Sequence, residues 1–323
     1  MSVLGLDIGG ANLKAAHSSG VCRVVPFLLW REPHALMARL RETLASFPPF
    51  ERCAVTMTGE LCDCFASQAE GVHTILTSVR DVAGTTGVLV WSLDGVFLSF
   101  EEAWRRTGDV AAANWLAQAT LAGRLAPEGA ALLIDIGSTT TDIVPLLNST
   151  PVPTGRTDPE RMAAAELLYT GAVRTPVCAV LGPEVAAEFF ATMADVYHVL
   201  GDRTPAAGQP TADGKPATLE NAHARLARMR CADPATYPTK ETLKLALRAR
   251  ERQEAMLINA IDVVRAHLPQ PPRSILVSGS GAFVLERLRP RLRPHAWLSL
   301  AQAWGEPQSA CACAWAVARL AAE

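Results

Sequence analysis

A short string, Asp-Ile-Gly, follows an apolar strand at two places in this chain, and this repeat limits the folds that the chain can adopt. The first copy begins at Asp7 and the second at Asp135, so 135 − 7 = 128 positions separate them. Solenoid repeats recur every 20 to 50 residues or so. One pair at this larger distance instead predicts two copies of a single half-fold.

Composition places the chain among globular proteins. Of its 323 residues 49% are hydrophobic and 19% charged, which excludes a disordered chain and suits about two domains. The net charge of −2 gives no basic field for nucleic acid or anionic lipid, and no apolar run has the length of a membrane helix. The first strand starts almost at once and the eight cysteines are scattered, so we expect no signal peptide and a cytoplasmic protein with reduced thiols.

Hydrophobic periodicity and turn residues predict alternating strands and helices along the chain. The predicted strands span residues 3–8, 12–17, 22–29, 53–57, 73–79, 88–91, 96–100, 177–180 and 274–277, with two more on either side of a turn within 131–146. The predicted helices span residues 34–47, 109–125, 158–169, 183–200, 219–230, 240–268 and 308–320, and one more follows residue 281.

The residues after each Asp-Ile strand suit phosphate binding. Glycine lets backbone N–H groups approach an anion, and neighbouring hydroxyls can donate to phosphate oxygens. Asp7 and Asp135 can approach phosphate only with a cation between, which implies Mg²⁺ held by these two carboxylates. A third glycine-rich turn follows the strand at 274–277. The candidate ligands of phosphate are Gly9, Gly10, Asn12 and Lys14 in the first turn, Gly137, Ser138, Thr139, Thr140 and Asp142 in the second, and Gly279, Ser280 and Gly281 in the third.

These three segments resemble the first phosphate, second phosphate and adenosine motifs of the actin, Hsp70 and sugar-kinase superfamily. The resemblance implies an α/β protein with the actin-like ATPase fold, in which two ribonuclease-H-like halves each hold a mixed sheet flanked by helices. We place the halves at residues 1–129 and 130–323, with a helical insertion in the second. Asn12 stands where kinases of this superfamily carry Thr. The hydantoinase/oxoprolinase-like branch is the most similar, but this chain is far shorter than its large amide-opening subunits.

More narrowly, the chain resembles the tetrahydromethanopterin-linked one-carbon transfer pathway proteins. The matching strings begin at Asp7 (Asp-Ile-Gly-Gly-Ala-Asn-Leu-Lys), Thr56 (Thr-Met-Thr-Gly-Glu-Leu-Cys-Asp-Cys-Phe) and Tyr169 (Tyr-Thr-Gly-Ala-Val-Arg-Thr-Pro), and shorter ones begin at Ala194, Ala212 and Arg225. The resemblance implies a transferase that joins an aminomethyl-furanmethanol diphosphate to a phenol and releases diphosphate. The phenol is γ-glutamyltyramine in archaeal methanofuran and is expected to derive from tyrosine in bacterial methylofuran.

Four carboxylates are candidates for the base that accepts the phenol's proton: Glu60, Asp63, Asp195 and Asp213. The sequence does not rank them, and each alone also suits a solvated or helix-capping carboxylate. We expect Glu60 and Asp213, together with Asp7 and Asp135, to form the catalytic set.

Two basic residues are further candidates. Arg174 suits bidentate binding of phosphate or carboxylate, or else an ordinary surface ion pair. Lys215 lies in a Pro/Gly-rich loop, residues 201–216, which we expect to close over the diphosphate as a lid, or else to be a solvated connection.

Two other functions fit the same motifs. One is an ATP-dependent small-molecule kinase or hydrolase, and the other is a nucleotide-binding switch protein without catalysis. ATP binding is compatible with the motifs, although the transferase function does not require it. We expect small-molecule diphosphate and phenol partners and neither nucleic acid nor membrane, and leave open whether the chain forms a homo-oligomer.

Overall fold

The computed structural model describes residues 1–323 and contains two mixed β-sheets with the same core topology. In the first sheet the spatial order is β3-β2-β1-β4-β5-β6. Strand β1 pairs antiparallel with β2 and parallel with β4. The strands are β1 (Val3–Ile8), β2 (Asn12–His17), β3 (Cys22–Pro26), β4 (Arg52–Met57), β5 (Gly87–Trp91) and β6 (Phe97–Ser99).

The second sheet repeats this arrangement in the order β10-β8-β7-β11-β12, with the short β9 paired to β8. Here β7 takes the place of β1, because it pairs antiparallel with β8 and parallel with β11. The strands are β7 (Ala130–Ile136), β8 (Thr141–Leu147), β9 (Thr150–Pro151), β10 (Leu167–Leu168), β11 (Ser274–Ser278) and β12 (Ala296–Ser299).

The repeat extends to single hydrogen bonds. In the first turn the backbone N–H of Gly9 donates to the carbonyl of Asn12 (3.0 Å). In the second turn, 128 positions later, Gly137 donates to Thr140 in the same way (2.8 Å). The two Asp-Ile-Gly segments are therefore equivalent strand-to-strand turns.

Successive side chains of β1 and β7 point to opposite faces of their sheets, and each face packs against a different set of helices. In β1, Leu4, Leu6 and Ile8 pack in the core that includes α1 and α2, while in β7 Ile134 and Ile136 pack in the core that includes α10 and α11. Asp7 and Asp135 consequently lie on the opposite, inner faces of the two sheets. The helices of these outer layers are α1 (Leu36–Ala45), α2 (Gln68–Ala83), α10 (Thr239–Ala266) and α11 (Ala282–Leu292).

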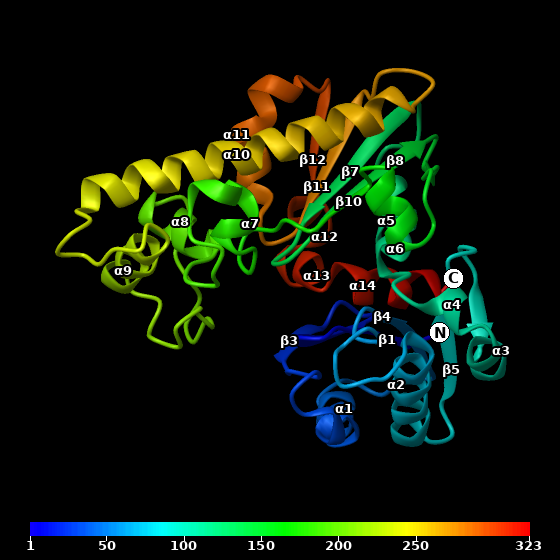
Figure 1. Ribbon diagram of the computed structural model, residues 1–323. Coiled ribbons are helices and arrows are strands. Elements are labelled where there is room, and N and C mark those ends of the chain that lie inside the picture. The colour runs from blue at the N-terminus through cyan, green and yellow to red at the C-terminus, as the bar shows by residue number, and fades with distance from the viewer.

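Two helices, α5 (Asn114–Gly123) and α14 (Ala312–Leu320), fill the space between the inner faces. Helix α14 lies against β1, β2 and β4 of the first sheet, and α5 lies against β7 and β8 of the second. The two helices also pack on each other, and Figure 1 shows α14 crossing between the sheets. One apolar core therefore joins both halves, containing Val3 and Ala54 of the first sheet and Leu133 and Leu276 of the second. The division between residues 129 and 130 falls just before β7 and stays a prediction.

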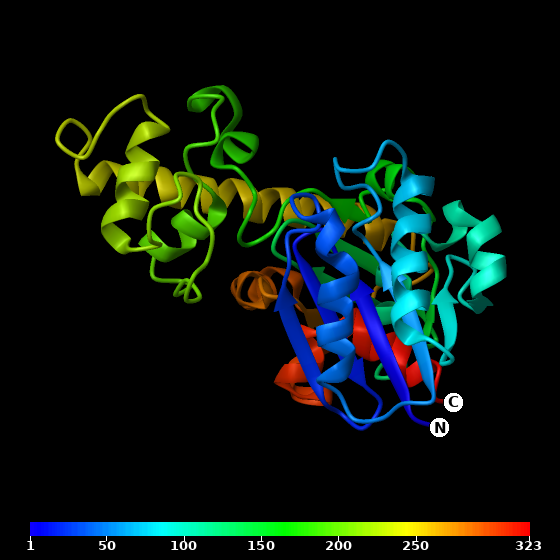
Figure 2. The same ribbon diagram turned by 90° about the horizontal axis from the view of Figure 1, so that it is seen from below.

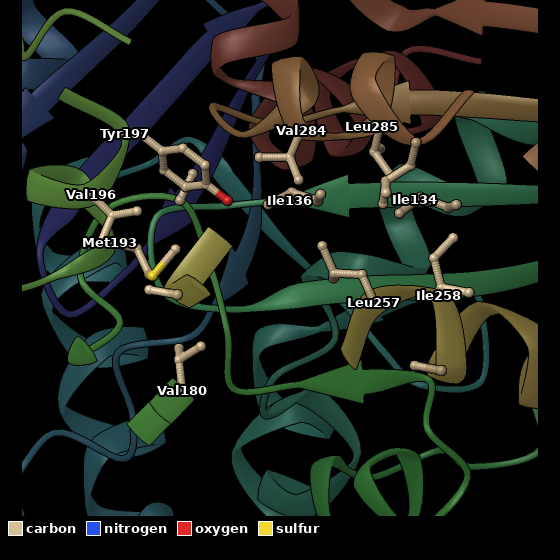
Figure 3. Packing of buried hydrophobic residues seen from close by; sticks show 14 of the residues in the cluster. Ile134, Ile136, Val180, Met193, Val196, Tyr197, Leu257, Ile258, Val284 and Leu285 are labelled. Atoms are coloured by element: carbon tan, nitrogen blue, oxygen red, sulfur yellow. The ribbon is translucent and has the colours of Figure 1, made fainter. Parts of the chain in front are cut away.

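Between β8 and β11 the chain forms a helical insertion that extends away from the sheets, as Figures 1 and 2 show for α7 to α9. The long helix α10 connects it to the second sheet. Figure 3 shows how the insertion is anchored: Tyr197 of α8 lies in the same apolar cluster as Ile136 of β7, Val284 of α11 and Leu257 of α10. The insertion holds α7 (Val177–Leu181), α8 (Met193–Val199) and α9 (Leu219–Arg228), whereas α6 (Asp158–Ala163) packs beside β10 of the second sheet.

The remaining elements are short. They are the 3₁₀ turns Pro33–Ala35 and Gly182–Glu184 and the helices α3 (Phe100–Arg105), α4 (Thr107–Val110), α12 (Leu300–Trp304) and α13 (Glu306–Ala310). None of the helices in the structure has both the length and the apolar character needed to cross a membrane.

Two predicted strands are wrong. Residues 73–79 lie inside helix α2, where Val72, Ile75, Leu76 and Val79 form one buried face at helical spacing. The Ser67 hydroxyl caps this helix by accepting the N–H of Glu70 (3.2 Å), a start signal that the β-branched residues downstream obscured. Residues 177–180 lie in α7, which is too short for its periodicity to differ from that of a buried strand.

Three predicted helices are wrong in extent, and β12 was missed. The helix predicted at 183–200 begins only at α8, where Thr192 and Asp195 form a capping box. The helix predicted at 109–125 is interrupted at Ala112, which has a positive φ of 47°. The helix predicted at 158–169 ends at residue 163, and Ala165 at φ 58° turns the chain into β10. In each case the hydrophobic periodicity continues past the point where the helix is interrupted. The interruption comes from an alanine with positive φ at residues 112 and 165, and from the helix cap at Thr192.

Close packing of α14 on β1 leads to a stability prediction. A Cβ on Gly5 would lie 2.0 Å from the carbonyl oxygen of Ala314, so Gly5→Ala forces backbone apart at the junction of the halves. We expect a loss of at least about 2 kcal/mol in the free energy of unfolding, measured by urea denaturation. Gly108→Ala, which would place its Cβ in open space, is the matched control. Equal stability of the two variants would contradict the tight contact.

Candidate functional site

Lys14 brings together the charges of the two halves. It lies opposite Asp7 in the β1–β2 register and is electrostatically coupled to both Asp7 and Asp135. Burial lowers the pKa of Lys14, but Asp7, Cys313, Asp135 and Cys311 together outweigh burial, and the pKa is raised overall. The ammonium therefore stays charged, and its charge acts on an aspartate of each half.

Asp7 has an incomplete set of partners. Its Oδ1 is buried without a hydrogen bond, and so is the hydroxyl of Thr56, its register neighbour on β4. Burial raises the pKa of Asp7 and Lys14 opposes this rise, leaving the pKa above its usual value. Buried polar atoms without partners are rare in folded proteins, so these two mark a place where a ligand completes the hydrogen bonding.

Asp135 is better supported. On the neighbouring strand β11 its register partner is Ser278, whose hydroxyl accepts a hydrogen bond from Gln118 Nε2 (2.9 Å). The thiol of Cys313 in turn donates to Gln118 Oε1 (3.3 Å), so α5 and α14 both contribute to this network. Burial and the nearby Asp142 raise the pKa of Asp135 to about 6, against the lowering effects of Gln118, Lys14 and Ser278.

The second phosphate turn is fixed by the segment after β10. The N–H groups of Val173 and Arg174 both donate to the Ser138 carbonyl (3.1 and 2.7 Å), and Ala172 donates to Gly137 (3.0 Å). The hydroxyls of Ser138 and Thr139 lie 3.4 Å apart. Held in this way, the turn presents its hydroxyls and N–H groups without further ordering, which favours anion binding.

The third motif packs directly on the second. Gly279 has a φ of 89°, and a Cβ there would lie 2.2 Å from Asp135 Oδ1. The N–H of Gly281 donates to the Ile136 carbonyl (2.8 Å). Residues 279–281 are thus brought beside Asp135, as the three-motif arrangement predicts.

Among the candidate bases, Glu60 is placed at the site. It is 1% exposed, its Oε2 has no hydrogen-bond partner, and it follows Gly59, whose N–H donates to the Ile8 carbonyl (3.0 Å). Burial, with smaller contributions from Asp158 and Asp7, raises the pKa of Glu60 to about 7. A carboxylate that titrates near neutrality is suited to proton transfer.

The other candidate bases differ in their surroundings. Asp63 is exposed. Asp195 caps α8 and accepts hydrogen bonds from Nε and Nη2 of the buried Arg225 (3.0 and 2.6 Å). Asp213 accepts a hydrogen bond from Nη1 of the same arginine (3.1 Å) and another from the Lys215 N–H (3.2 Å), so both residues lie beside α9 in the helical insertion. The pKa of Asp213 is lowered: burial raises it, but the Lys215 N–H and Arg225 outweigh burial.

Two predicted phosphate ligands have notable contacts. Asp142 pairs with the buried Arg161 (2.9 Å), whose guanidinium lies 3.9 Å from the centre of the Trp115 ring. The charge of the exposed Arg174 acts on Cys62: burial raises the pKa of this thiol to about 11, and Arg174 opposes the rise. A Cβ on Gly10 would lie 2.8 Å from that Cys62 Sγ.

Five residues of the site were not predicted from the sequence: Thr56, Ser278, Gln118, Cys313 and Arg161. Thr56 and Ser278 lie in the last two residues of the strands that flank β1 and β7, so strand ends offered a signal for them. Gln118 lies in an Ala-rich helix and Cys313 near the end of the chain, and no local pattern marks either one.

The site meets the demands of Mg²⁺ only in part. No group of three His, Cys, Asp or Glu side chains could hold a metal ion by itself. The unpartnered Oδ1 of Asp7 and the partly exposed Asp135 nevertheless fit Mg²⁺ of the kind that takes one or two carboxylates and completes its shell with substrate phosphate and water.

Paired sheets of this topology with phosphate turns at the ends of β1 and β7 define an actin-like ATPase fold. A nucleotide-free structure of acetone carboxylase is similar, with a TM-score of 0.50 and 12% identity over 95% of this chain and 51% of that one. Residues 52–323 match the model of the hydantoinase/oxoprolinase family, and the chain belongs to that family.

Two curated relatives share one name, (4-{4-[2-(gamma-L-glutamylamino)ethyl]phenoxymethyl}furan-2-yl)methanamine synthase. The protein of Methanocaldococcus jannaschii is 29% identical and covers 98% of this chain and 97% of its own length. That of Methanococcus vannielii is 30% identical over 48% of this chain and 72% of its own length.

The raised pKa of Glu60 predicts a pH dependence of stability. The folded state holds this proton more tightly than the unfolded state, in which the pKa is near the usual 4.5, so its contribution to stability is lost as the pH rises toward 7. Glu60→Gln should therefore gain up to about 3 kcal/mol relative to the wild type between pH values of about 4 and 8. Urea denaturation across this range measures the difference. Glu188→Gln, at an exposed site, is the control, and parallel curves for all three proteins would contradict the burial of an ionisable Glu60.

Proposed function

We propose that this protein is a transferase that joins an aminomethyl-furanmethanol diphosphate to a phenol, forming the ether of methanofuran or methylofuran and releasing diphosphate. The observation that carries the proposal is the electrostatic coupling of Lys14 to Asp7 and Asp135, which precede the two proposed phosphate turns, in a chain with a near full-length relative. That relative's name contains a phenoxymethyl group on a furan methanamine, which is the ether that such a reaction forms.

The diphosphate is bound by groups of both halves. In this proposal the N–H groups and side chains of the first turn (Gly9, Gly10, Asn12) and the hydroxyls of the second (Ser138, Thr139, Thr140) donate to its oxygens, and Lys14 supplies a positive charge. Mg²⁺, held by Asp7 and Asp135, would offset further negative charge on the leaving group when bound. Arg174 and the turn 279–281 complete the enclosure from the second half.

The reaction exchanges one carbon–oxygen bond for another. The bond between the furylmethyl carbon and the diphosphate oxygen breaks, and its electron pair leaves with diphosphate. The phenol oxygen then bonds to that carbon, and the phenol's proton passes to the carboxylate of Glu60. A group with a pKa of about 7 can take up this proton near neutral pH and release it to water afterwards.

The remaining charged candidates have supporting roles in the proposal. Asp142, paired with Arg161, holds the edge of the second turn rather than contacting phosphate as a free anion. Asp213 anchors the loop that carries Lys215, since it binds both the Lys215 N–H (3.2 Å) and Arg225. The reaction is proposed to occur in the cytoplasm, and all eight cysteines of the chain are free thiols.

The first test is product formation. With a furylmethyl diphosphate, Mg²⁺ and either tyrosine or a tyramine amide, the purified protein should form ether and diphosphate, detected by mass spectrometry. EDTA should abolish turnover, and Asp7→Asn should lower kcat at least about a hundredfold while the protein stays folded. Asp262→Asn, a substitution in the last turns of α10, should have no effect. Rapid ATP turnover without ether would instead favour the kinase or hydrolase, and nucleotide binding without turnover would favour the switch protein.

The second test concerns the loop of residues 201–216. The proposal gives Lys215 the role of closing the site against water, which would otherwise convert the furylmethyl carbon to an alcohol. Lys215→Ala should raise the ratio of alcohol to ether, measured by chromatography of the products. Lys240→Ala, another exposed lysine of the insertion, should leave the ratio unchanged. The same ratio in both variants would remove the loop from the mechanism.

A further inference from the structure

Tyr169 presents an exposed aromatic ring from a rigid segment. Tyr169 is 61% exposed, yet the residues on either side of it are held by hydrogen bonds. Leu168 pairs with Thr141 in the sheet, and the Thr141 hydroxyl donates to the Thr170 carbonyl (2.6 Å). The buried Gln253 of α10 donates to the Thr170 hydroxyl (2.7 Å). An exposed ring on a backbone held so firmly is preorganised for a ligand.

The position of this ring is set by the second phosphate turn. Thr141 directly follows Thr140 of that turn, so pairing of β10 with β8 places Tyr169 next to the phosphate-binding residues. The adjoining stretch after Gly171 donates two hydrogen bonds to Ser138. A carbon attached to a diphosphate in the turn would therefore lie close to Tyr169.

The charges of three carboxylates act on the ring. Burial raises the pKa of Tyr169, and the charges of Asp158, Glu60 and Asp142 raise it further. Glu60 belongs to the first half and the two aspartates to the second, so negative charge from both halves acts on the ring. Negative charge beside an aromatic face favours a cationic ligand over an anionic one.

We propose that the ring of Tyr169 packs against the furan of the donor and stabilises the positive charge that develops on the furylmethyl group. This inference rests on the proposed function. As the carbon–oxygen bond breaks, the electron pair goes to diphosphate and the positive charge spreads over the furan. The face of an aromatic ring attracts such a charge, and the stacked geometry also orients the planar furan for attack by the phenol.

Two substitutions separate the ring from its hydroxyl. Tyr169→Phe keeps the ring and should retain kcat within about twofold, whereas Tyr169→Leu should lower kcat about tenfold, the size expected of a desolvated cation–π contact. Because the effect arises in the transition state, KM for the donor should change little. Equal losses in both variants, or a rise in KM with unchanged kcat, would overturn the role of the ring.

A second measurement reports on the charge itself. Donors with a methyl or a bromo substituent on the furan form a more stable or a less stable cation, and the ratio of their kcat values measures the demand for charge stabilisation. This ratio should be larger in Tyr169→Leu than in the wild type, and a purely structural role for Tyr169 would leave it unchanged. Absence of ether from the wild type would remove the proposed function and this inference together. Ether formation with the same ratio in both proteins would remove the inference alone.

Discussion

The charge of Lys14 acts on the carboxylates of both Asp7 and Asp135, and much of the site depends on this electrostatic coupling between the halves. Each aspartate is the last residue but one of β1 or β7, on the same face as Val3 or Leu133 of the core between the two sheets. Without a cation between them, two carboxylates and an incoming diphosphate would repel one another. The partly buried lysine lowers this cost before any metal binds. The positive charge of Lys14 belongs to the first half but acts on carboxylates of both halves. The reaction therefore depends on how the two sheets are positioned relative to each other.

The two copies of the repeat have diverged in chemically useful ways. Lys14 and Asp142 occupy equivalent positions, each opposite the aspartate of its own sheet. Lys14 has a basic side chain, whereas Asp142 has an acidic one. The acid is matched by Arg161, which is buried against Trp115 of α5. The half with Lys14 leaves buried oxygens of Asp7 and Thr56 without partners, whereas the other half satisfies Asp135 through Ser278 and Gln118. The second half is thus suited to hold Asp135 in a fixed position, and the first half, with its unpartnered oxygens, is suited to accept a ligand.

Much of the fold could be predicted from the sequence, because the repeat identified β1 and β7 as equivalent strands of two half-folds and the glycine-rich segments marked the turns that follow them and β11. Periodicity failed where local and tertiary signals disagreed: the β-branched run in α2 indicated a strand, and positive-φ alanines at 112 and 165 interrupted apparent helices. For the site, residues within the turns were accessible to sequence reasoning. Gln118 and Cys313 were not, since they reach Asp135 only after α5 and α14 fold between the sheets. Only the structure separates Glu60 from Asp213. Glu60 is buried at the site, whereas Asp213 is hydrogen-bonded to Arg225.

The central claim is that both phosphate turns hold a leaving group, so that chemistry occurs at carbon and not at phosphorus. The most direct measurement places ¹⁸O in the oxygen that bridges the furylmethyl carbon and the diphosphate, and follows it by ³¹P NMR and mass spectrometry. The account predicts that all of the label leaves with diphosphate and that the ether carries the phenol's own oxygen. Label retained on the furan product would show cleavage at phosphorus and would contradict the account, since the protein would then be a phosphoryl transferase or hydrolase.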